Sequence, residues 1–151
     1  MRVLDLSKEL DKLKAFYDSL DEEKKTFTLP WTLLEKAIIV VVEEDKGRII
    51  GISGIRDNYF AFTCIEKQFQ GKGIGTKLIK ERNKIVKKNR IGILYATTHK
   101  NNIIAQRLLE KSGYNLVKIE EDIYHYKLYI TMKAKLLKFL SKWANKIGLK
   151  T

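Results

Sequence analysis

Three glycines within five residues constrain the fold of this chain more than any other feature of its sequence. An apolar, strand-like run ends at Ile65, and the segment that follows contains Gln70-Gly71-Lys72-Gly73-Ile74-Gly75-Thr76. After it, a helical period places on one face Ile74, Leu78, Ile79, Ile85 and Val86. A strand, a glycine turn and a helix N-terminus together predict an anion site. Backbone N–H groups point outward there, the helix dipole adds positive potential, and glycine lets a phosphate approach closely.

Two common phosphate-binding loops do not fit this segment. The Rossmann pattern G-x-G-x-x-G needs a glycine where Thr76 or Leu78 stands. The P-loop pattern G-x-x-x-x-G-K-[ST], counted from Gly71, also needs a glycine at Thr76. The spacing that the segment does fit is Q-x-x-G-x-G, formed by Gln70, Gly73 and Gly75.

The remaining periodicity predicts one mixed α/β domain in which helices flank a mostly antiparallel sheet. We expect a helix over residues 6–20 with Ser7 as its N-cap, and a short helix opened by Pro30. Three strands in an antiparallel meander follow, over 37–42, 48–56 and 59–65, joined by turns at 44–47 and 57–58. The later elements are expected to be the glycine-loop helix, strands over 91–97, 115–120 and 123–130, and a helix over 102–111. In that last helix Ile104, Ala105, Leu108 and Leu109 are expected to face inward, and Gly113 is its left-handed stop. A short strand near residues 2–4 is the one addition considered.

Two segments carry a resemblance to a known family. The stretch IEKQFQGKGIGTKLI resembles the acyl-CoA-binding motif [RQ]-x-x-G-x-[GA] of the GNAT superfamily of N-acetyltransferases. The stretch NNIIAQRLLEKSGYN resembles the family's second motif helix, with Asn102, Ala105, Gly113 and Tyr114 in place. The two segments stand in the family's order, and the spacing suits one helix and one strand between them. The resemblance covers about residues 1–130, leaving 131–151 as an extension.

The resemblance implies a cofactor site for acetyl-CoA. In this family the loop N–H groups bind the pyrophosphate, and the strand before the loop pairs with the pantetheine arm. On this chain the strand edge is at Cys64 and Ile65, and Asn102 would face the pantetheine near the thiol. The loop donors would be Gln70, Gly71, Lys72, Gly73, Gly75 and Thr76.

The resemblance also shows a departure at the catalytic groups. Many members carry a tyrosine acid seven residues after the asparagine, and here that position is Leu109. Some carry a carboxylate base where Thr97 and Thr98 stand. The substitutes that the sequence offers are His99, just after a strand, and Glu66, just after the cofactor-facing strand. Each is also an ordinary surface residue in the alternative interpretation. The sequence around Cys64 shows no obvious activating base, and Cys64 is interpreted as a small apolar strand residue.

The charge of the chain, +12 from 30 Lys+Arg and 18 Asp+Glu, is strongest in its last segment. Residues 131–151 predict a basic amphipathic helix, with an apolar face formed by Leu136, Phe139, Leu140, Trp143, Ala144 and Ile147. Lysines occupy the other face. Three interpretations stay open: packing on its own domain or a dimer partner, contact with an anionic membrane, and contact with nucleic acid.

The sequence thus predicts a GNAT-fold N-acetyltransferase that transfers an acetyl group from acetyl-CoA to a primary amine of a small molecule or protein. The alternatives are a catalytically silent acyl-CoA-binding module, favoured by Leu109, and a membrane-surface protein that uses the fold as a scaffold. One cysteine and two histidines predict no metal site and no disulfide framework. No apolar run has the length of a bilayer span, and the first residues lack a signal-peptide core. We therefore expect a cytoplasmic location, or a peripheral one at the membrane.

Overall fold

The computed structural model describes residues 1–22, 30–57 and 59–148. One seven-stranded sheet runs through the molecule in the order β1-β2-β3-β4-β5-β7-β6. Every neighbouring pair is antiparallel except β4 with β5, which is parallel. The strands are β1 (Arg2–Val3), β2 (Ala37–Asp45), β3 (Arg48–Arg56), β4 (Phe60–Ile65), β5 (Ile93–His99), β6 (Asn115–Glu120) and β7 (Ile123–Tyr129).

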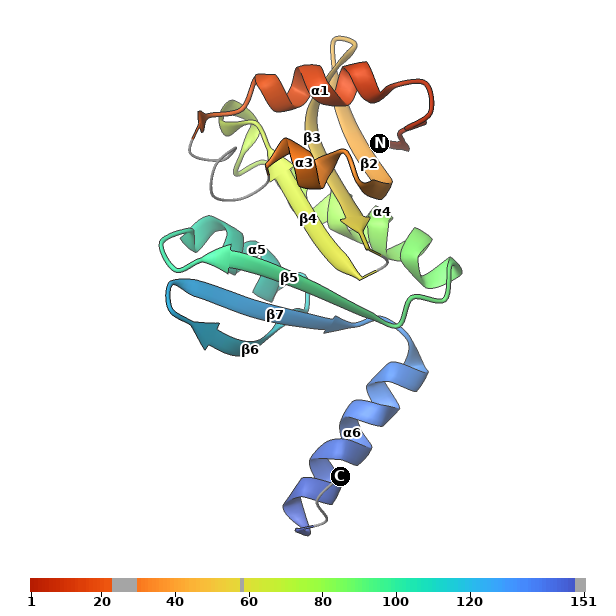
Figure 1. Cartoon of the computed structure of the whole chain (residues 1–151), viewed down its shortest axis with the longest axis vertical. Helices are drawn as coiled ribbons and strands as arrows, with labels where there is room; N and C mark the ends of the chain where they lie inside the picture. The colour runs from red at the N-terminus through yellow and green to blue at the C-terminus, as the bar shows by residue number, and fades with distance from the viewer. Residues whose placement is uncertain (23–29, 58, 149–151) are drawn as a thin grey trace.

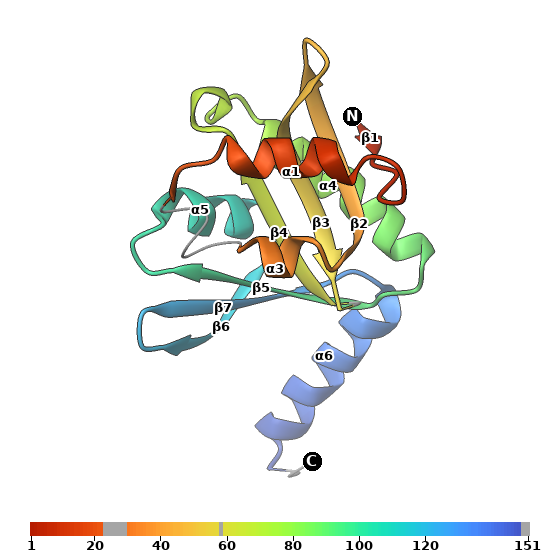
Figure 2. The same ribbon diagram turned by 45° about the horizontal axis from the view of Figure 1, so that its top comes forward.

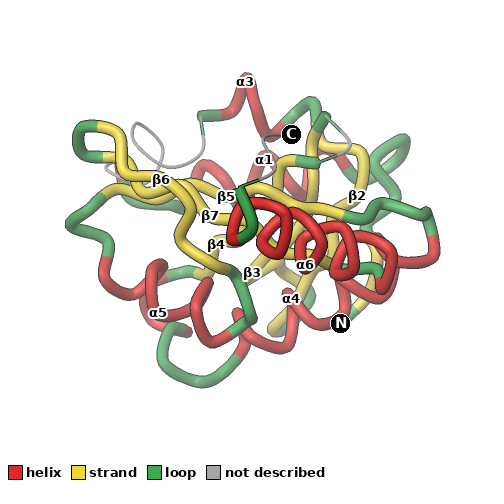
Figure 3. The backbone as a smooth tube through the Cα atoms, turned by 90° about the horizontal axis from the view of Figure 1, so that it is seen from below, coloured by secondary structure: helices red, strands yellow, loops and turns green. Residues whose placement is uncertain are grey.

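Helices cover both faces of the sheet (Figure 1). One face carries α1 (Leu10–Asp18) and α3 (Trp31–Leu34), and the other carries α4 (Ile74–Lys88) and α5 (Ile103–Lys111), as the view along the sheet in Figure 3 shows. A three-residue helical turn, η1 (Lys67–Phe69), precedes the glycine loop, and α6 (Met132–Lys146) ends the described chain. The expected fold, a mixed and mostly antiparallel sheet flanked by helices with a C-terminal helix, is confirmed. The division at residue 130 stays a prediction.

Alternation along the central strands supplies a core on each face of the sheet. Val40, Val42 and Ile52 point toward α1 and α3, where they pack with Leu13, Phe16 and Leu34. Ile55, Leu94 and Ala96 point to the opposite face and pack with Val86, Tyr114 and Tyr126. The β4 strand therefore divides its side chains between the two cores, with Cys64 on the α1 face and Ala61 on the α4 face.

The first helix is shorter than the sequence predicts. It begins at Leu10, and its N-cap is Glu9 without a side-chain cap bond, so the prediction of Ser7 as the cap is wrong. The Ser7 hydroxyl and N–H both donate to Asp5 Oδ1, at 2.6 and 3.1 Å. This local turn competes with the helix for the same groups and delays its start by four residues.

Two other boundaries and the burial of one residue also differ from the prediction. The first hairpin turn tightens to Lys46 and Gly47, both at positive φ, so that Glu44 and Asp45 stay in β2. The strand predicted over 91–97 occupies Ile93–His99. Ile104 was expected to face inward, yet 67% of its surface is exposed, because it lies on the outer side of α5. The turn predicted at 57–58 includes Asn58, which lies outside the described residues.

Candidate functional site

The sheet splits between β4 and β5. The only ladder pair that joins these two strands among the described residues is Phe60 with Tyr95, and the Tyr95 N–H donates to the Tyr59 carbonyl at 2.8 Å. Past this point the strands diverge toward their carboxyl ends, which Figures 1 and 2 show. A sheet that opens in this way can accept an extended ligand between its two strands.

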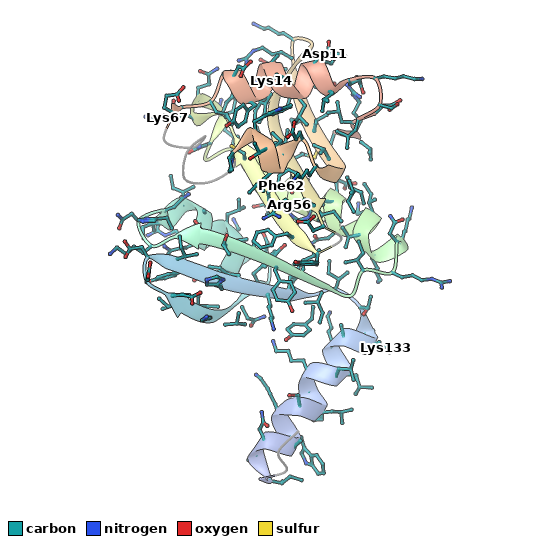
Figure 4. The ribbon with its side chains drawn as sticks, in the orientation of Figure 1. Asp11, Lys14, Arg56, Phe62, Lys67 and Lys133 are labelled. Atoms are coloured by element: carbon teal, nitrogen blue, oxygen red, sulfur yellow. The ribbon has the colours of Figure 1, made fainter. Side chains whose placement is uncertain are left out.

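A cleft of about 250 Å³ occupies the split and reaches both faces of the sheet. On the α3 side it is bounded by Leu33 and Phe62; on the other side it is bounded by Arg82 and Leu109. Figure 4 marks Arg56 and Phe62 beside it. The full lining is Pro30, Leu33, Arg56, Phe60–Thr63, Arg82, Ala96–Thr98, Ala105, Leu108 and Leu109. A ligand that enters from the α4 face can therefore meet a second one that enters from the α3 face.

The glycine loop lies at the open end of β4 and presents unpaired donors. Gly71 and Gly73 adopt positive φ, 76° and 77°, and Gly73 is the N-cap of α4. Among the described residues, no acceptor is found for the backbone N–H groups from Gly71 to Thr76; the first backbone bond of the helix runs from Lys77 N to Gly73 O. A β-carbon on Gly75 would come within 3.1 Å of Leu108, so glycine there allows α4 to pack closely on α5. The loop thus presents a run of backbone N–H groups at a helix N-terminus, which is the arrangement that binds anions in proteins.

Three other predicted cofactor residues have partners within the chain. Gln70 donates its N–H to the Lys67 carbonyl and its side-chain amide to the Ile65 carbonyl, at 3.2 and 3.1 Å. The Cys64 side chain is buried in the core toward α1. Asn102 caps α5, because its Oδ1 accepts the Ala105 N–H at 3.1 Å. Of the residues predicted for the pyrophosphate, Gly71 to Thr76 therefore present open donors, and Gln70 orders the loop against β4.

The two candidate catalytic groups, Glu66 and His99, lie outside the lining of the cleft. Glu66 is 7% exposed, and its carboxylate accepts hydrogen bonds from Arg48, Gln68 and Ser19. His99 accepts the Asn101 N–H on Nδ1 at 3.2 Å, and its Nε2 lies 3.9 Å from Asp122. Both stand at the carboxyl ends of the strands that border the split, since His99 ends β5 and Glu66 follows β4, but neither is among the described lining residues of the cleft. Leu109, in contrast, does line the cleft.

The sequence interpretation missed Arg82, which is 1% exposed and lines the cleft from α4. Its Nη1 donates to Ser53 Oγ at 3.1 Å, and its Nη2 donates to the Tyr114 hydroxyl at 2.7 Å. Nε and Nη2 also reach Asn83 Oδ1 at 3.2 and 2.9 Å. Ser53 Oγ is in turn 2.8 Å from the hydroxyl of Thr63, another lining residue.

Electrostatically, Arg82 is a buried cation without an acidic partner among the described residues. Burial lowers the pKa of Arg82 and raises the pKa of Tyr114, and the contact between the two opposes both shifts. The signal in the sequence was its position: Arg82 follows Leu78 and precedes Val86 by four residues each, so it occupies the apolar stripe of α4. A charge at a core position of this kind marks a place where function outweighs packing.

The model of the acetyltransferase (GNAT) family matches residues 6–114, which is more than half of the chain. The chain therefore belongs to the GNAT acetyltransferase family. None of the curated proteins compared with this chain matches its sequence.

Solved structures with this fold cover most of the chain. An acetyltransferase of the GNAT family from Streptococcus pneumoniae is 21% identical, with a TM-score of 0.64 over 85% of this chain and 98% of that one. The yncA protein of Salmonella typhimurium, with its cofactor acetyl-CoA, is 16% identical, with a TM-score of 0.65 over 87% and 93%. The ribosomal-protein-alanine N-acetyltransferase of Brucella melitensis is 14% identical, with a TM-score of 0.65 over 85% and 99%. At these identities the likeness establishes the fold.

Two features are absent from the described residues. No group of three or more His, Cys, Asp and Glu side chains is placed to hold a metal ion within residues 1–22, 30–57 and 59–148. No helix in the same ranges combines the length and apolar character needed to cross a bilayer.

Proposed function

We propose that this protein transfers an acetyl group from acetyl-CoA to a primary amine of a small molecule or a protein. The observation that carries the proposal is the run of open N–H donors from Gly71 to Thr76 at the mouth of the β4–β5 split. The donors suit a pyrophosphate, and the split between β4 and β5 suits an extended pantetheine arm. The fold supports it too, since an acetyl-CoA complex is known for the yncA neighbour.

Calorimetric titration tests the site. Acetyl-CoA and CoA are expected to bind at micromolar concentration, and ATP, which offers phosphates without the pantetheine arm, is expected to bind far more weakly. Equal binding of all three would reduce the loop to a general anion site. No binding of acetyl-CoA would leave the loop as a turn and overturn the proposal.

The reaction develops positive charge on the amine nitrogen and negative charge on the thiolate sulfur. The amine nitrogen attacks the thioester carbon and a C–N bond forms. The C–S bond breaks, the thiolate leaves with the electron pair, and the nitrogen gives up one proton to water. The chain lacks the tyrosine that would protonate the thiolate, because Leu109 lines the cleft at that position. A positive charge in a site that excludes water can stabilise the leaving thiolate instead.

Arg82 is placed to supply this charge. It donates to Ser53, and Ser53 contacts the Thr63 hydroxyl at the cleft. Because a guanidinium only donates, the Ser53 oxygen accepts from Arg82. The Ser53 hydroxyl in turn lies 2.8 Å from the Thr63 hydroxyl and 3.3 Å from the Phe62 carbonyl, so the positive charge acts on the cleft through Ser53. In this proposal Arg82 replaces the missing acid electrostatically and transfers no proton.

The cleft offers no carboxylate or imidazole among its described lining residues, so the amine has to arrive neutral. Below the pKa of the acceptor amine, kcat/KM is expected to rise about tenfold per pH unit, without a further inflection between pH 5 and 8. The measurement compares an α-amine, with a pKa of about 8, and an ε-amine, with a pKa of about 10.4. The midpoint of the profile is expected to move with the amine.

Two variants serve as controls for this pH dependence. His99→Gln and Glu66→Gln are expected to leave the profile unchanged, since both side chains lie outside the cleft. An inflection that is the same for both amines and disappears in one of these variants would make that residue the base and contradict the expectation.

The silent acyl-CoA-binding module is the second candidate, and Leu109 is the observation that favours it. Turnover against a broad panel of amines separates the two. Tight acetyl-CoA binding without release of free thiol for any amine would favour the binding module.

A further inference from the structure

The C-terminal helix stands away from the rest of the molecule. Figures 1 and 2 show α6 projecting from the end of β7, and the only buried residue in the helix is Ala134. Its start is fixed: Thr131 Oγ1 accepts the Ala134 N–H at 3.2 Å, and a β-carbon on Gly92 would lie 3.5 Å from that of Ala134. The Ile130 N–H also donates to the Gly92 carbonyl at 2.7 Å. The direction and the rotation of the helix are therefore set by its first turn.

This rotation turns the apolar face of α6 away from its own domain. Each residue rotates an α-helix by about 100°, and Trp143 follows Ala134 by nine residues, so Trp143 lies about half a turn from the side that contacts the domain. Five other exposed apolar side chains lie on the same face as Trp143. We call the six together the outer stripe: Met132, Leu136, Phe139, Leu140, Trp143 and Ile147. Their exposed fractions run from 46% to 77%. Packing on its own domain, one of the three interpretations of this segment, does not occur at this face.

Positive charge flanks the outer stripe without any counter-charge. The helix contains five lysines, and no Asp or Glu occurs in the sequence after Asp122. Four of the lysines share one flank, Lys135, Lys138, Lys142 and Lys146, and Lys133, marked in Figure 4, stands apart from them. Lys138 also lies over the Tyr129 ring, 4.7 Å from its centroid, at the side near the domain.

We infer that α6 is a docking surface for an anionic lipid bilayer, on which the helix lies flat with the outer stripe inserted. A helix with aromatic and aliphatic residues on one face and lysines beside them fits the boundary between acyl chains and acidic headgroups. Trp143 would sit at the interface, where indole rings concentrate. This inference does not depend on the acetyl transfer proposed above.

The same observations argue against the other two occupants. A second copy of the chain would pair two outer stripes and thereby bring together two lysine flanks that hold no acidic residue to neutralise them. Nucleic acid would be met by the lysines at one side, while the outer stripe would remain in water. An anionic bilayer, with an apolar interior and negative headgroups, can bury the outer stripe and neutralise the lysines at the same time.

Co-sedimentation of the full chain with vesicles tests the inference. Vesicles of equal parts phosphatidylglycerol and phosphatidylcholine are expected to pellet the protein at 0.1 M salt, and pure phosphatidylcholine vesicles are expected to pellet about tenfold less. Phe139→Ser with Trp143→Ser is expected to reduce pelleting on the acidic vesicles at least about tenfold. Both side chains are more than half exposed, so the double variant leaves the core of the domain intact.

A charge-matched pair of variants controls for the net charge. Lys138→Glu with Lys142→Glu is expected to abolish pelleting, whereas Lys36→Glu with Lys111→Glu, which makes the same charge change at exposed residues elsewhere, is expected to preserve most of it. Equal pelleting of the native chain and the Phe139/Trp143 variant would overturn the inference. So would a dimer in sedimentation velocity that the same variant dissociates, or binding to a DNA duplex that displaces the protein from vesicles and persists in that variant.

Discussion

Gly73→Asp is expected to reduce the affinity for acetyl-CoA at least about 100-fold. Gly73 is the N-cap of α4, in the middle of the open donors, with φ of 77°. A β-carbon there would meet no atom within 4 Å, so the loss does not come from a steric clash in the free protein. It comes from a carboxylate that competes for the donors and repels the pyrophosphate at short range.

Gly73→Asn is the matched control, because the two side chains have the same shape and both tolerate positive φ. The amide variant retains the backbone cost but carries no charge, and its affinity is expected to stay within about tenfold of the native protein. Calorimetry on both variants measures the difference, and thermal unfolding confirms that each is folded. If the Asp and Asn variants bind acetyl-CoA with equal affinity, the pyrophosphate does not bind at this loop.

The sequence predicts the loop well because each of its signals is local. A strand ends, the glycines at 71 and 73 supply positive φ, and a stripe of period 3.6 begins at Ile74; no contact from elsewhere is needed to infer this order. The split between β4 and β5 is different. It follows from a sheet in which β5 pairs with β4 at one register and with β7 along its length, which no local pattern encodes.

The errors have different physical causes. Serine is a common N-cap residue, but the hydroxyl and the N–H of Ser7 both donate to the side chain of Asp5 instead. Isoleucine is a common core residue, but Ile104 lies on the solvent side of α5. For α6 the helical periodicity predicts an apolar face and a lysine face. It does not predict which side of the helix contacts the domain, and this is set by the contact of Ala134 with Gly92.

Arg82→Met is expected to lower kcat about 100-fold while the affinity for acetyl-CoA changes less than about threefold. The estimate takes the lower end of the loss seen when one preorganised donor is removed from an active site, about 10² to 10³. The melting temperature is expected to fall modestly, because methionine removes a desolvated charge but also removes the donor to the buried Ser53 and Tyr114 hydroxyls. A loss of turnover much larger than this loss of stability would mean that the cation is retained for catalysis.

The leaving group separates this role from a structural one. If Arg82 stabilises the departing thiolate, the loss in Arg82→Met is expected to shrink with the acetyl thioester of a more acidic aromatic thiol, since that thiolate needs less help. Leu109→Tyr, added to Arg82→Met, is expected to recover part of the turnover, because Leu109 lines the same cleft. An equal loss with both donors, and no recovery with tyrosine, would reduce Arg82 to a residue that holds Ser53 and Tyr114 in place. In the expected case, two features of one cleft are coupled: Leu109 cannot protonate the thiolate, and Arg82, which lines the same cleft, stabilises its charge instead.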